Sequence, residues 1–410
     1  MAHKTKIGDS FYEVTGGKVK VGDSVYEIKG GKTKIGDSVY DISFTLAPES
    51  SDIWQMSGGG GTSIVAADIS YINGYWVVVG MGNSSGRIAY ATKLDGTWTT
   101  VDLWTGINSG VRSISYGNGY YVAVGYDGDN PSTGAIAYAT SLSGPWTVTY
   151  PGTQYFSSVI YISEKNQWVA AGGAPPSYSG GIDVIFYCTN PTGTWSKVTN
   201  KLNCPIEDIT YANGYYVAIG VGYTYIPAYG YGSHYMRCSY GTDLTGTWTG
   251  GNIVEQASNT SGTIYEINSI IYVNGYWIDV GYDRNRGASY VAYRTTLGGT
   301  RTVVEIFTGY TSQNYHSIKS IIYHDGYYII TGHRSESNSS KIAIMAYATT
   351  LDGPWTVVDL WSLPSSYGSA YGIATDGDYI AICGDQFVTD GSYTVARVEY
   401  SPTIEGFNEI

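Results

Sequence analysis

The sequence predicts an all-β protein, and three observations support this fold class. Aromatic residues make up 15% of the chain and charged residues only 14%, a composition rich in strand formers and poor in helix formers. The 55 glycines suit a fold with many turns. A unit of four expected strands recurs seven times along most of the chain. Together these observations predict a seven-bladed β-propeller with four antiparallel strands per blade, preceded by a small β-hairpin repeat module.

The N-terminal region, residues 1–44, consists of three copies of one short motif. Lys4-Thr-Lys-Ile-Gly-Asp-Ser-Phe-Tyr-Glu-Val recurs from Lys18 and again from Lys32, a step of 14 residues. Each copy is typical of a hairpin, because glycine at the first central position suits a tight turn. A single hairpin cannot bury a face alone. We therefore predict an attachment module over 1–44, with a solubilising tail as the alternative, followed by a linker over 45–62.

The second repeat fills residues 63–410. Each copy is marked by a turn followed by an apolar strand, as in Asn73-Gly74-Tyr75-Trp76. Asn-Gly is a strong hairpin signal, because both central residues need positive φ. A spacing of 45 to 61 residues between copies is near that of propeller blades. The copies begin at Asn73, Asn118, Lys165, Asn213, Asn274, Asp325 and Asp376.

Two aromatic positions recur within these copies, and we interpret them as core or turn residues rather than as a binding site. Arg301 and Phe407 take the place of the tryptophan in the fifth and seventh copies. The recurring tyrosines are Tyr90, Tyr138, Tyr187, Tyr240, Tyr293, Tyr347 and Tyr400. The recurring tryptophans are Trp98, Trp146, Trp195, Trp248 and Trp355.

Closure of the ring is predicted from a third motif. Asp52-Ile53-Trp54 matches Asp102-Leu103-Trp104 and Asp359-Leu360-Trp361, which end the fourth strands of two copies. We therefore predict that the segment around 52–54 completes the last blade and removes its free edge. Residues 407–410 are the alternative closing strand.

Strand order divides the connections between two faces of the ring. The first-to-second and third-to-fourth turns are short and nearly constant, whereas the connections on the other face vary in length and chemistry. Variable loops on a rigid scaffold are the usual place for recognition. Tyrosine-rich loops give rigid contact area, and we expect a ligand-binding face there. The residues predicted to bind are Tyr126, Asp127, Tyr178, Tyr223, Tyr225, Tyr229, Tyr231, His234, Tyr282, Arg284, Arg286, Tyr310, Tyr315, His333 and Arg334.

Charge and targeting signals narrow the expected partners. The net charge is −12, and since residues 1–44 hold seven lysines against six acidic residues, the remainder carries −13. An acidic body argues against nucleic acid and anionic membranes as partners. The N-terminus has no apolar stretch, so we expect neither a secretory signal nor a membrane-inserted segment.

No cofactor and no metal is expected, and we predict that the protein is not an enzyme. The histidines and the four cysteines show no metal-ligand spacing, and no nucleophile or phosphate-binding motif is present. Asp127 and Asp129 could hold a calcium ion, but a plain turn is the favoured interpretation. A pair of carboxylates with glycosidase spacing stays open among the 34 acidic residues.

The blade unit resembles the repeats of propellers found in bacteriophage and bacterial surface proteins. The resemblance rests on Ile-Ser-Tyr-Gly-Asn-Gly-Tyr-Tyr-Val-Ala-Val-Gly (114–125) and Ile-Ala-Tyr-Ala-Thr-Ser-Leu-Ser-Gly-Pro-Trp-Thr (136–147). The unit is also similar to the Asp-box repeat of sialidase-like propellers, although Ser143 and Thr245 stand where Asp95 and Asp352 precede the turn glycine. These departures, and the lack of a recognisable arginine triad, argue against sialidase activity.

The N-terminal triplicate, residues 4–44, resembles Lys-x-x-Ile-Gly-x-x-x-Tyr-x-Ile repeats of phage virion proteins. This resemblance implies a tail- or fibre-type virion protein that is made in the host cytoplasm and released by lysis. Residues 1–44 would attach it to other virion proteins, and the propeller would bind a host-surface glycan or protein. A purely structural decoration protein and a glycan-cleaving enzyme are the alternatives. The oligomeric state stays open, including a homo-oligomer.

Overall fold

The computed structural model describes most of the propeller with its side chains. For strands that extend beyond the ranges below, only the backbone pairing is described. The described residues are 52–54, 66–106, 109–128, 133–152, 154–173, 183–222, 235–253, 266–283, 288–308, 316–335, 341–361, 368–387, 394–404 and 406–407.

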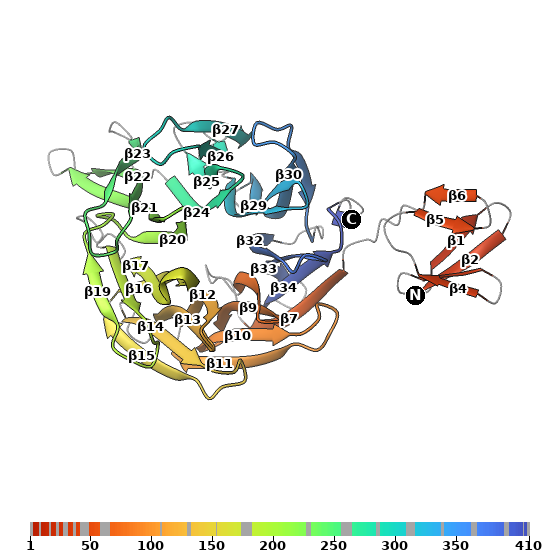
Figure 1. Cartoon of the computed structure of the whole chain (residues 1–410), viewed down its shortest axis with the longest axis horizontal. Coiled ribbons are helices and arrows are strands. Elements are labelled where there is room, and N and C mark those ends of the chain that lie inside the picture. The colour runs from red at the N-terminus through yellow and green to blue at the C-terminus, as the bar shows by residue number, and fades with distance from the viewer. Residues whose placement is uncertain are drawn as a thin grey trace.

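The predicted propeller is confirmed: seven four-stranded antiparallel sheets form a ring (Figure 1). The innermost strands are β8 (Ala66–Ile72), β12 (Gly110–Gly117), β16 (Tyr155–Ile162), β20 (Ile206–Ala212), β24 (Tyr265–Val273), β28 (Ser317–His324) and β32 (Tyr367–Thr375). The second strands are β9 (Tyr75–Gly82), β13 (Tyr120–Asp127), β17 (Gln167–Gly173), β21 (Tyr215–Ile226), β25 (Tyr276–Asp283), β29 (Tyr327–Ser337) and β33 (Ile380–Val388). The third strands are β10 (Ser85–Ala91), β14 (Thr133–Ala139), β18 (Asp183–Cys188), β22 (Tyr231–Gly241), β26 (Ala288–Arg294), β30 (Ser340–Ala348) and β34 (Tyr393–Ser401). The outer strands are β11 (Thr99–Thr105), β15 (Thr147–Gly152), β19 (Ser196–Thr199), β23 (Thr249–Glu255), β27 (Thr302–Phe307), β31 (Thr356–Asp359) and β7 (Glu49–Ser57).

The turns between the first and second strands behave as the Asn-Gly motif predicts. Asn73, Asn118, Asn213 and Asn274 have φ between 46° and 52°, and the glycine after each has φ near 80°. These are the left-handed conformations that a two-residue hairpin turn requires. In the third blade a short 3-10 helix, η1 (Ser163–Lys165), replaces the turn.

The closing strand comes from the N-terminal side of the propeller, as Asp52-Ile53-Trp54 predicted. Strand β7 pairs antiparallel with β34, from Tyr400 opposite Glu49 to Tyr393 opposite Ser57. Arg397 Nε lies 3.1 Å from Asp52 Oδ1. In the first blade, Asp102 stands at the same position of the motif, and its Oδ1 lies 2.7 Å from Arg87 Nε. The aspartate of the motif therefore fixes the outer strand to the third strand of its blade.

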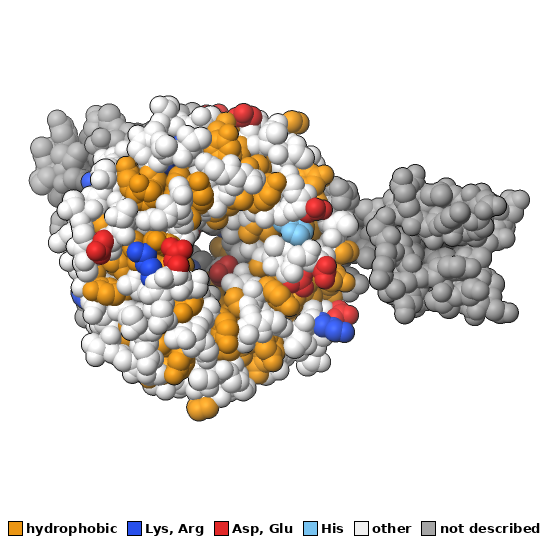
Figure 2. All heavy atoms as spheres, in the orientation of Figure 1, with side chains coloured by type: hydrophobic (Ala, Val, Ile, Leu, Met, Phe, Trp, Pro, Cys, Tyr) orange, Lys and Arg blue, Asp and Glu red, His pale blue; other side chains and the backbone are white. Residues whose placement is uncertain are grey.

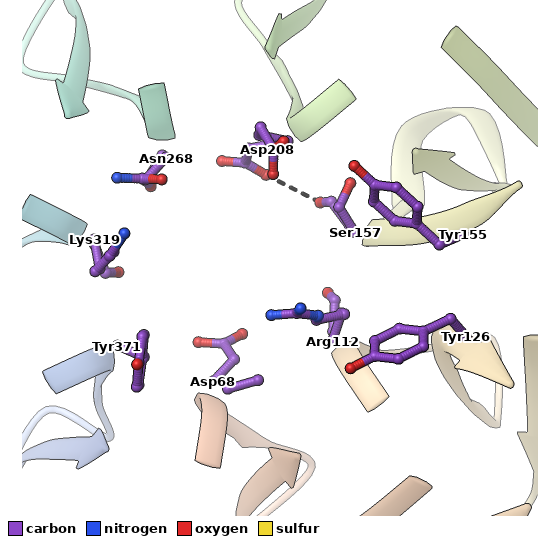
Figure 3. Close-up of a pocket in the computed structure, with 15 residues that line it drawn as sticks. Asp68, Arg112, Tyr126, Tyr155, Ser157, Asp208, Asn268, Lys319 and Tyr371 are labelled. Atoms are coloured by element: carbon purple, nitrogen blue, oxygen red, sulfur yellow. Dashed lines mark hydrogen bonds between the residues drawn. The ribbon is translucent and has the colours of Figure 1, made fainter. Parts of the chain in front are cut away.

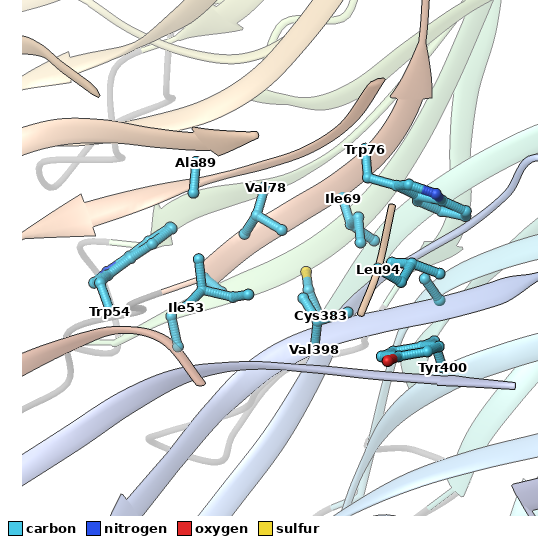
Figure 4. Packing of buried hydrophobic residues seen from close by; sticks show 13 residues of the cluster. Ile53, Trp54, Ile69, Trp76, Val78, Ala89, Leu94, Cys383, Val398 and Tyr400 are labelled. Carbon is cyan, nitrogen blue, oxygen red and sulfur yellow. The ribbon is translucent and has the colours of Figure 1, made fainter. Parts of the chain in front are cut away.

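The hydrophobic core is divided into seven clusters, each packed between two adjacent blades. At the junction of the last and first blades, Trp54 and Ile53 of β7 pack with Trp76, Val78 and Cys383 (Figure 4). The indole N–H of Trp54 donates to the carbonyl oxygen of Met81 at 2.8 Å. Neighbouring blades thus bury each other's faces, and β7 completes that burial at the seam.

The N-terminal repeats form strands, as predicted, but in two separate sheets. One sheet has the order β1 (His3–Ile7), β2 (Ser10–Thr15), β3 (Lys18–Val21) and β4 (Ser24–Glu27). The other pairs β5 (Lys32–Ile35) with β6 (Ser38–Asp41). Within the described residues, no helix has the length and apolar character needed to cross a membrane.

Candidate functional site

Each innermost strand carries a β-bulge at the same position. In all seven blades the pairing with the second strand shifts by one residue there, as between Val111 and Ser113 in β12. A bulge re-aims the extra side chain and is common at functional sites. The bulged residues, named here the channel ring, are Ala67, Arg112, Ser157, Glu207, Asn268, Lys319 and Tyr371.

A glycine of the second strand faces each bulge and explains why the bulge forms there. Gly125, for example, pairs with Val111, immediately before the bulged Arg112. A Cβ atom on Gly125 would overlap the carbonyl oxygen of Gly110. The same overlap would occur at Gly332 with the carbonyl of Ser317. Glycine is therefore required for the close approach of the two strands.

The channel ring lines a pocket of about 610 Å³ at one end of the central channel. All seven ring residues line it, together with Tyr126, Tyr155 and the residues that follow six of the bulges. Figure 3 shows these side chains converging from successive blades. Figure 2 views the ring down the same axis as Figure 1 and shows the central hollow, with few charged side chains on the visible face. A concave site with convergent polar groups is the default binding-site hypothesis.

The residues that follow the bulges hold the blades together. Ser113 Oγ accepts a hydrogen bond from the backbone N–H of Val159 in the next blade at 3.2 Å. Ser158 donates its hydroxyl proton to Asp208 Oδ1 at 3.0 Å, and Asp208 Oδ2 accepts from the N–H of Ile270 at 3.1 Å. Ser113, Ser158 and Asp208 of this second set therefore have a structural role between blades.

Charges in the pocket are mixed, with carboxylates in excess. Lys319 Nζ lies 2.6 Å from Glu266 Oε2. Burial would raise the pKa of Glu266, but the Lys319 ammonium and hydrogen bonds from Lys319 and Ser317 outweigh it and hold this pKa near 2. Burial and the nearby Asp208 carboxyl raise the pKa of Asp68 to about 7, against one hydrogen bond from the N–H of Ile69. Burial also raises the pKa of Glu207, and Arg112 opposes that rise.

One side of the pocket is aromatic. Tyr126 and Tyr155 flank Arg112 there, while Asp68 and Asp208 approach from opposite sides (Figure 3). The Arg112 guanidinium carbon lies 5.4 Å from the centroid of the Tyr126 ring, within cation–π range. Tyr126 is held in place by its hydroxyl contact to Met81 Sδ at 3.3 Å. The Tyr126 ring therefore has a fixed position in the pocket without a ligand.

Of the residues predicted from the sequence, Tyr126 lines the pocket. Asp127 follows it and accepts a hydrogen bond from the Ser109 hydroxyl at 3.2 Å. Arg334 is held by Asp359 through two hydrogen bonds of 3.0 and 2.7 Å. Tyr282 and His333 are buried, with 0% and 2% of their surface exposed, so neither presents surface to a ligand in this structure. Both residues lie within strands, β25 and β29, where the sequence suggested loops.

The tyrosine-rich segment of the fourth blade is not a loop over its whole length. Strands β21 and β22 run on to Ile226 and Tyr231, which pair, so most of this segment is a long hairpin. The side chains of ten predicted residues lie outside the described ranges. They are Tyr178, Tyr223, Tyr225, Tyr229, Tyr231, His234, Arg284, Arg286, Tyr310 and Tyr315. Asp129, the second residue of the calcium alternative, also lies outside them.

Sequence reasoning missed all seven residues of the channel ring, although the repeat contains a signal for them. In each innermost strand, an isoleucine or valine lies two residues after the bulged residue. When the seven strands are aligned on it, the bulged position holds seven different residue types. The next position holds only serine, aspartate or glycine. Variation concentrated at one position of a repeated strand marks the residue that the fold does not constrain.

Comparison with solved structures supports the propeller fold. No family model and no curated protein matches the sequence. The solved structure of the polysaccharide lyase Uly1 matches with a TM-score of 0.53 at 11% identity, over 84% of this chain and 91% of that one. A Trypanosoma rangeli sialidase in complex with sialic acid gives 0.48 at 13% identity over 88% of this chain, which spans only 60% of the sialidase. The propeller domain of the Trilobed protease from Pyrococcus furiosus gives 0.48 at 10% identity, over 85% and 98%. At such identities the likeness shows the fold alone: the chain is a seven-bladed β-propeller.

Proposed function

We propose that the protein is a saccharide-binding propeller whose ligand enters the pocket formed by the channel ring. The observation that carries this proposal is the ring itself: seven bulges, opposite seven glycines, present seven different residue types to one pocket. A purely structural ring would not need a different side chain in each blade. An asymmetric ligand with many polar groups would use that difference.

The chemistry of the pocket suits a sugar better than an apolar ligand. Arg112, Asn268 and Lys319 bear N–H donors, and Asp68 and Glu207 bear acceptors. Tyr126 and Tyr155 add aromatic surface with a polar tip. A saccharide presents hydroxyl donors and acceptors around an apolar ring face, and this combination complements such a lining.

The direction of the chain supports a division between attachment and binding. Strand β7 begins at Glu49, opposite Tyr400 near the end of the third strand of the last blade. In the other blades, the turn between the third and fourth strands lies at this end. The channel ring lies near the beginnings of the innermost strands, at the other end of the blades. Strand β7, which follows the repeats in the sequence, therefore begins at the end of the propeller away from the pocket.

Combined with the resemblance of residues 1–44 to phage virion repeats, this arrangement leads us to propose a tail- or fibre-type virion protein. The repeats would attach it to other virion proteins, and the pocket would bind a glycan of the host surface. The acidic balance of −13 over the rest of the chain disfavours nucleic acid as the partner. We propose binding without cleavage.

The test measures binding of the purified chain to isolated cell-wall polysaccharides of candidate hosts, with product release followed in parallel. Arg112→Ser gives the second blade the residue that the third blade has at this position, Ser157. Among the described residues Arg112 makes no hydrogen bond or ion pair, so the variant should fold normally. We expect it to bind about tenfold more weakly or worse, because hydrogen bonds from a charged donor are lost.

The matched control is Tyr225→Ala/Tyr229→Ala/Tyr231→Ala in the long hairpin of the fourth blade. Unchanged binding by this control, with loss in Arg112→Ser, places the site in the pocket. The reverse pattern would move the site to the hairpin. Absence of binding by the unmodified chain to every polysaccharide would leave the structural decoration protein, and release of shortened glycan would make the protein an enzyme.

A further inference from the structure

The hydrogen-bond donors around the pocket are largely used by the protein itself. The single O–H of Ser157 donates to the carbonyl oxygen of Ile206 at 2.6 Å, and the carbonyl oxygen of Ala171 lies 3.2 Å away as the alternative acceptor. The amide nitrogen of Asn268 donates to the carbonyl oxygen of Ile318 at 2.6 Å. Lys319 is engaged by Glu266. Arg112 makes no hydrogen bond or ion pair among the described residues, so it is the cationic side chain whose donors all remain available to a ligand.

The acceptors, by contrast, remain available. The Glu207 carboxyl has no hydrogen-bond or ion-pair partner among the described residues, and that of Asp68 accepts only the N–H of Ile69, through Oδ1. Glu207 belongs to the channel ring, and Asp68 follows the bulge of the first blade. Both side chains line the pocket and are half-buried. A ligand that fills the pocket meets unpaired carboxylate oxygens, which call for a donor.

The charges of the pocket indicate whether the ligand group that donates these hydrogen bonds should be neutral or positively charged. Three carboxyls of the lining, those of Asp68, Glu207 and Asp208, stand with two cationic side chains, Arg112 and Lys319, and the charge of Lys319 is already paired with Glu266. A ligand carboxylate or sulfate would add to this excess of negative charge. A ligand cation would reduce it.

We propose that the pocket selects a saccharide that carries a protonated amine, with the ammonium placed against the Glu207 carboxyl and the hydroxyl groups toward Arg112. This inference rests on the proposed saccharide function and specifies the ligand class of the same site. An ammonium group supplies three donors and one positive charge to a carboxyl that no described hydrogen bond satisfies. The aromatic side, with Tyr126 and Tyr155, is left for the sugar ring.

Protonation of the carboxyls gives the preference a pH dependence. Burial raises the pKa of Asp68 to about 7 and that of Asp208 to about 6, while hydrogen bonds lower both. Burial raises the pKa of Glu207, opposed by Arg112 from β12 and Lys319 from β28 and aided by Glu266 from β24. Tyr155 from β16 also faces Glu207. Acidification from pH 8 to pH 5 neutralises carboxyls and so weakens the attraction for an ammonium group.

The probes for the test are two forms of one oligosaccharide, with a primary amine at carbon 6 of the terminal sugar or with that amine acetylated. A primary alkyl amine stays protonated over this pH range, since its pKa is about 10. Calorimetry on the full chain at pH 7.5 is expected to show about tenfold or greater preference for the amine form. The preference should shrink at pH 5.

Glu207→Gln is the discriminating variant, because it keeps the size of the side chain and removes its charge. We expect it to lose most of the preference while it binds the acetylated form as the unmodified chain does. Equal binding of the two forms by the unmodified chain, or tighter binding of the acetylated form, would overturn the amine preference and leave saccharide binding intact. Binding of neither form, nor of any wall polysaccharide, would overturn the proposed function and the preference with it.

Discussion

Replacing Asp279 by alanine is expected to lower the free energy of unfolding by about 3–5 kcal/mol, because it leaves a buried guanidinium without its counter-ion. Asp279 is 1% exposed in the second strand of the fifth blade. Its carboxylate accepts two hydrogen bonds from Arg301, one of them 3.1 Å long from Nε. The Arg301 guanidinium also lies 4.7 Å from the centroid of the Tyr290 ring.

The other blades supply a matched rescue for this variant. They have residues such as Val78 or Ala123 at the position of Asp279, and most have tryptophan at the position of Arg301. The double variant Asp279→Ala/Arg301→Trp should therefore recover most of the lost stability, whereas Arg301→Trp alone should be destabilised. Chemical denaturation of the four proteins measures this. A loss below about 1 kcal/mol for Asp279→Ala would contradict the account of the pair.

Replacing Trp54 by alanine is expected to cost about 3–5 kcal/mol as well, since a buried tryptophan leaves a large cavity. Trp54 is 6% exposed at the seam where β7 joins the last blade to the first. Its N–H donates to the carbonyl oxygen of Met81 in the first blade. The variant thus loses both the packing and the polar contact that close the ring.

Trp54→Phe separates the two contributions, because it keeps most of the apolar contact and removes only the donor. We expect it to lose about 1 kcal/mol. Thermal and denaturant unfolding of both variants provide the measurement. If Trp54→Ala were as stable as the unmodified chain, the ring would not depend on β7 for its closure.

The local signals in the sequence predicted the architecture well, because repetition averages out ambiguity. Asn73-Gly74 and its copies specify a turn through φ alone, and the structure has that turn. The match of Asp52-Ile53-Trp54 to Asp102-Leu103-Trp104 predicted the closing strand, because the aspartate pairs with an arginine and the tryptophan packs at a blade junction in both places.

The pocket was harder to predict, because it depends on pairing between strands. Whether Arg112 or Ser113 faces the channel is decided by a bulge, and the bulge depends on Gly125 of the neighbouring strand. Likewise, His333 looked like a loop residue until the length of β29 placed it inside the blade. The partner of Arg301 could not be read from the sequence, since Asp279 stands between the apolar residues Ile278 and Val280 of a strand.

The most direct test of the central claim is a crystal structure of the protein soaked with a saccharide that it binds in solution. The account predicts the sugar at the channel ring, with its hydroxyl groups within hydrogen-bond distance of Arg112 and a ring face against Tyr126 or Tyr155. A sugar bound only at the hairpin of β21 and β22, or on the face of the Asn-Gly turns, with the pocket empty, would contradict it.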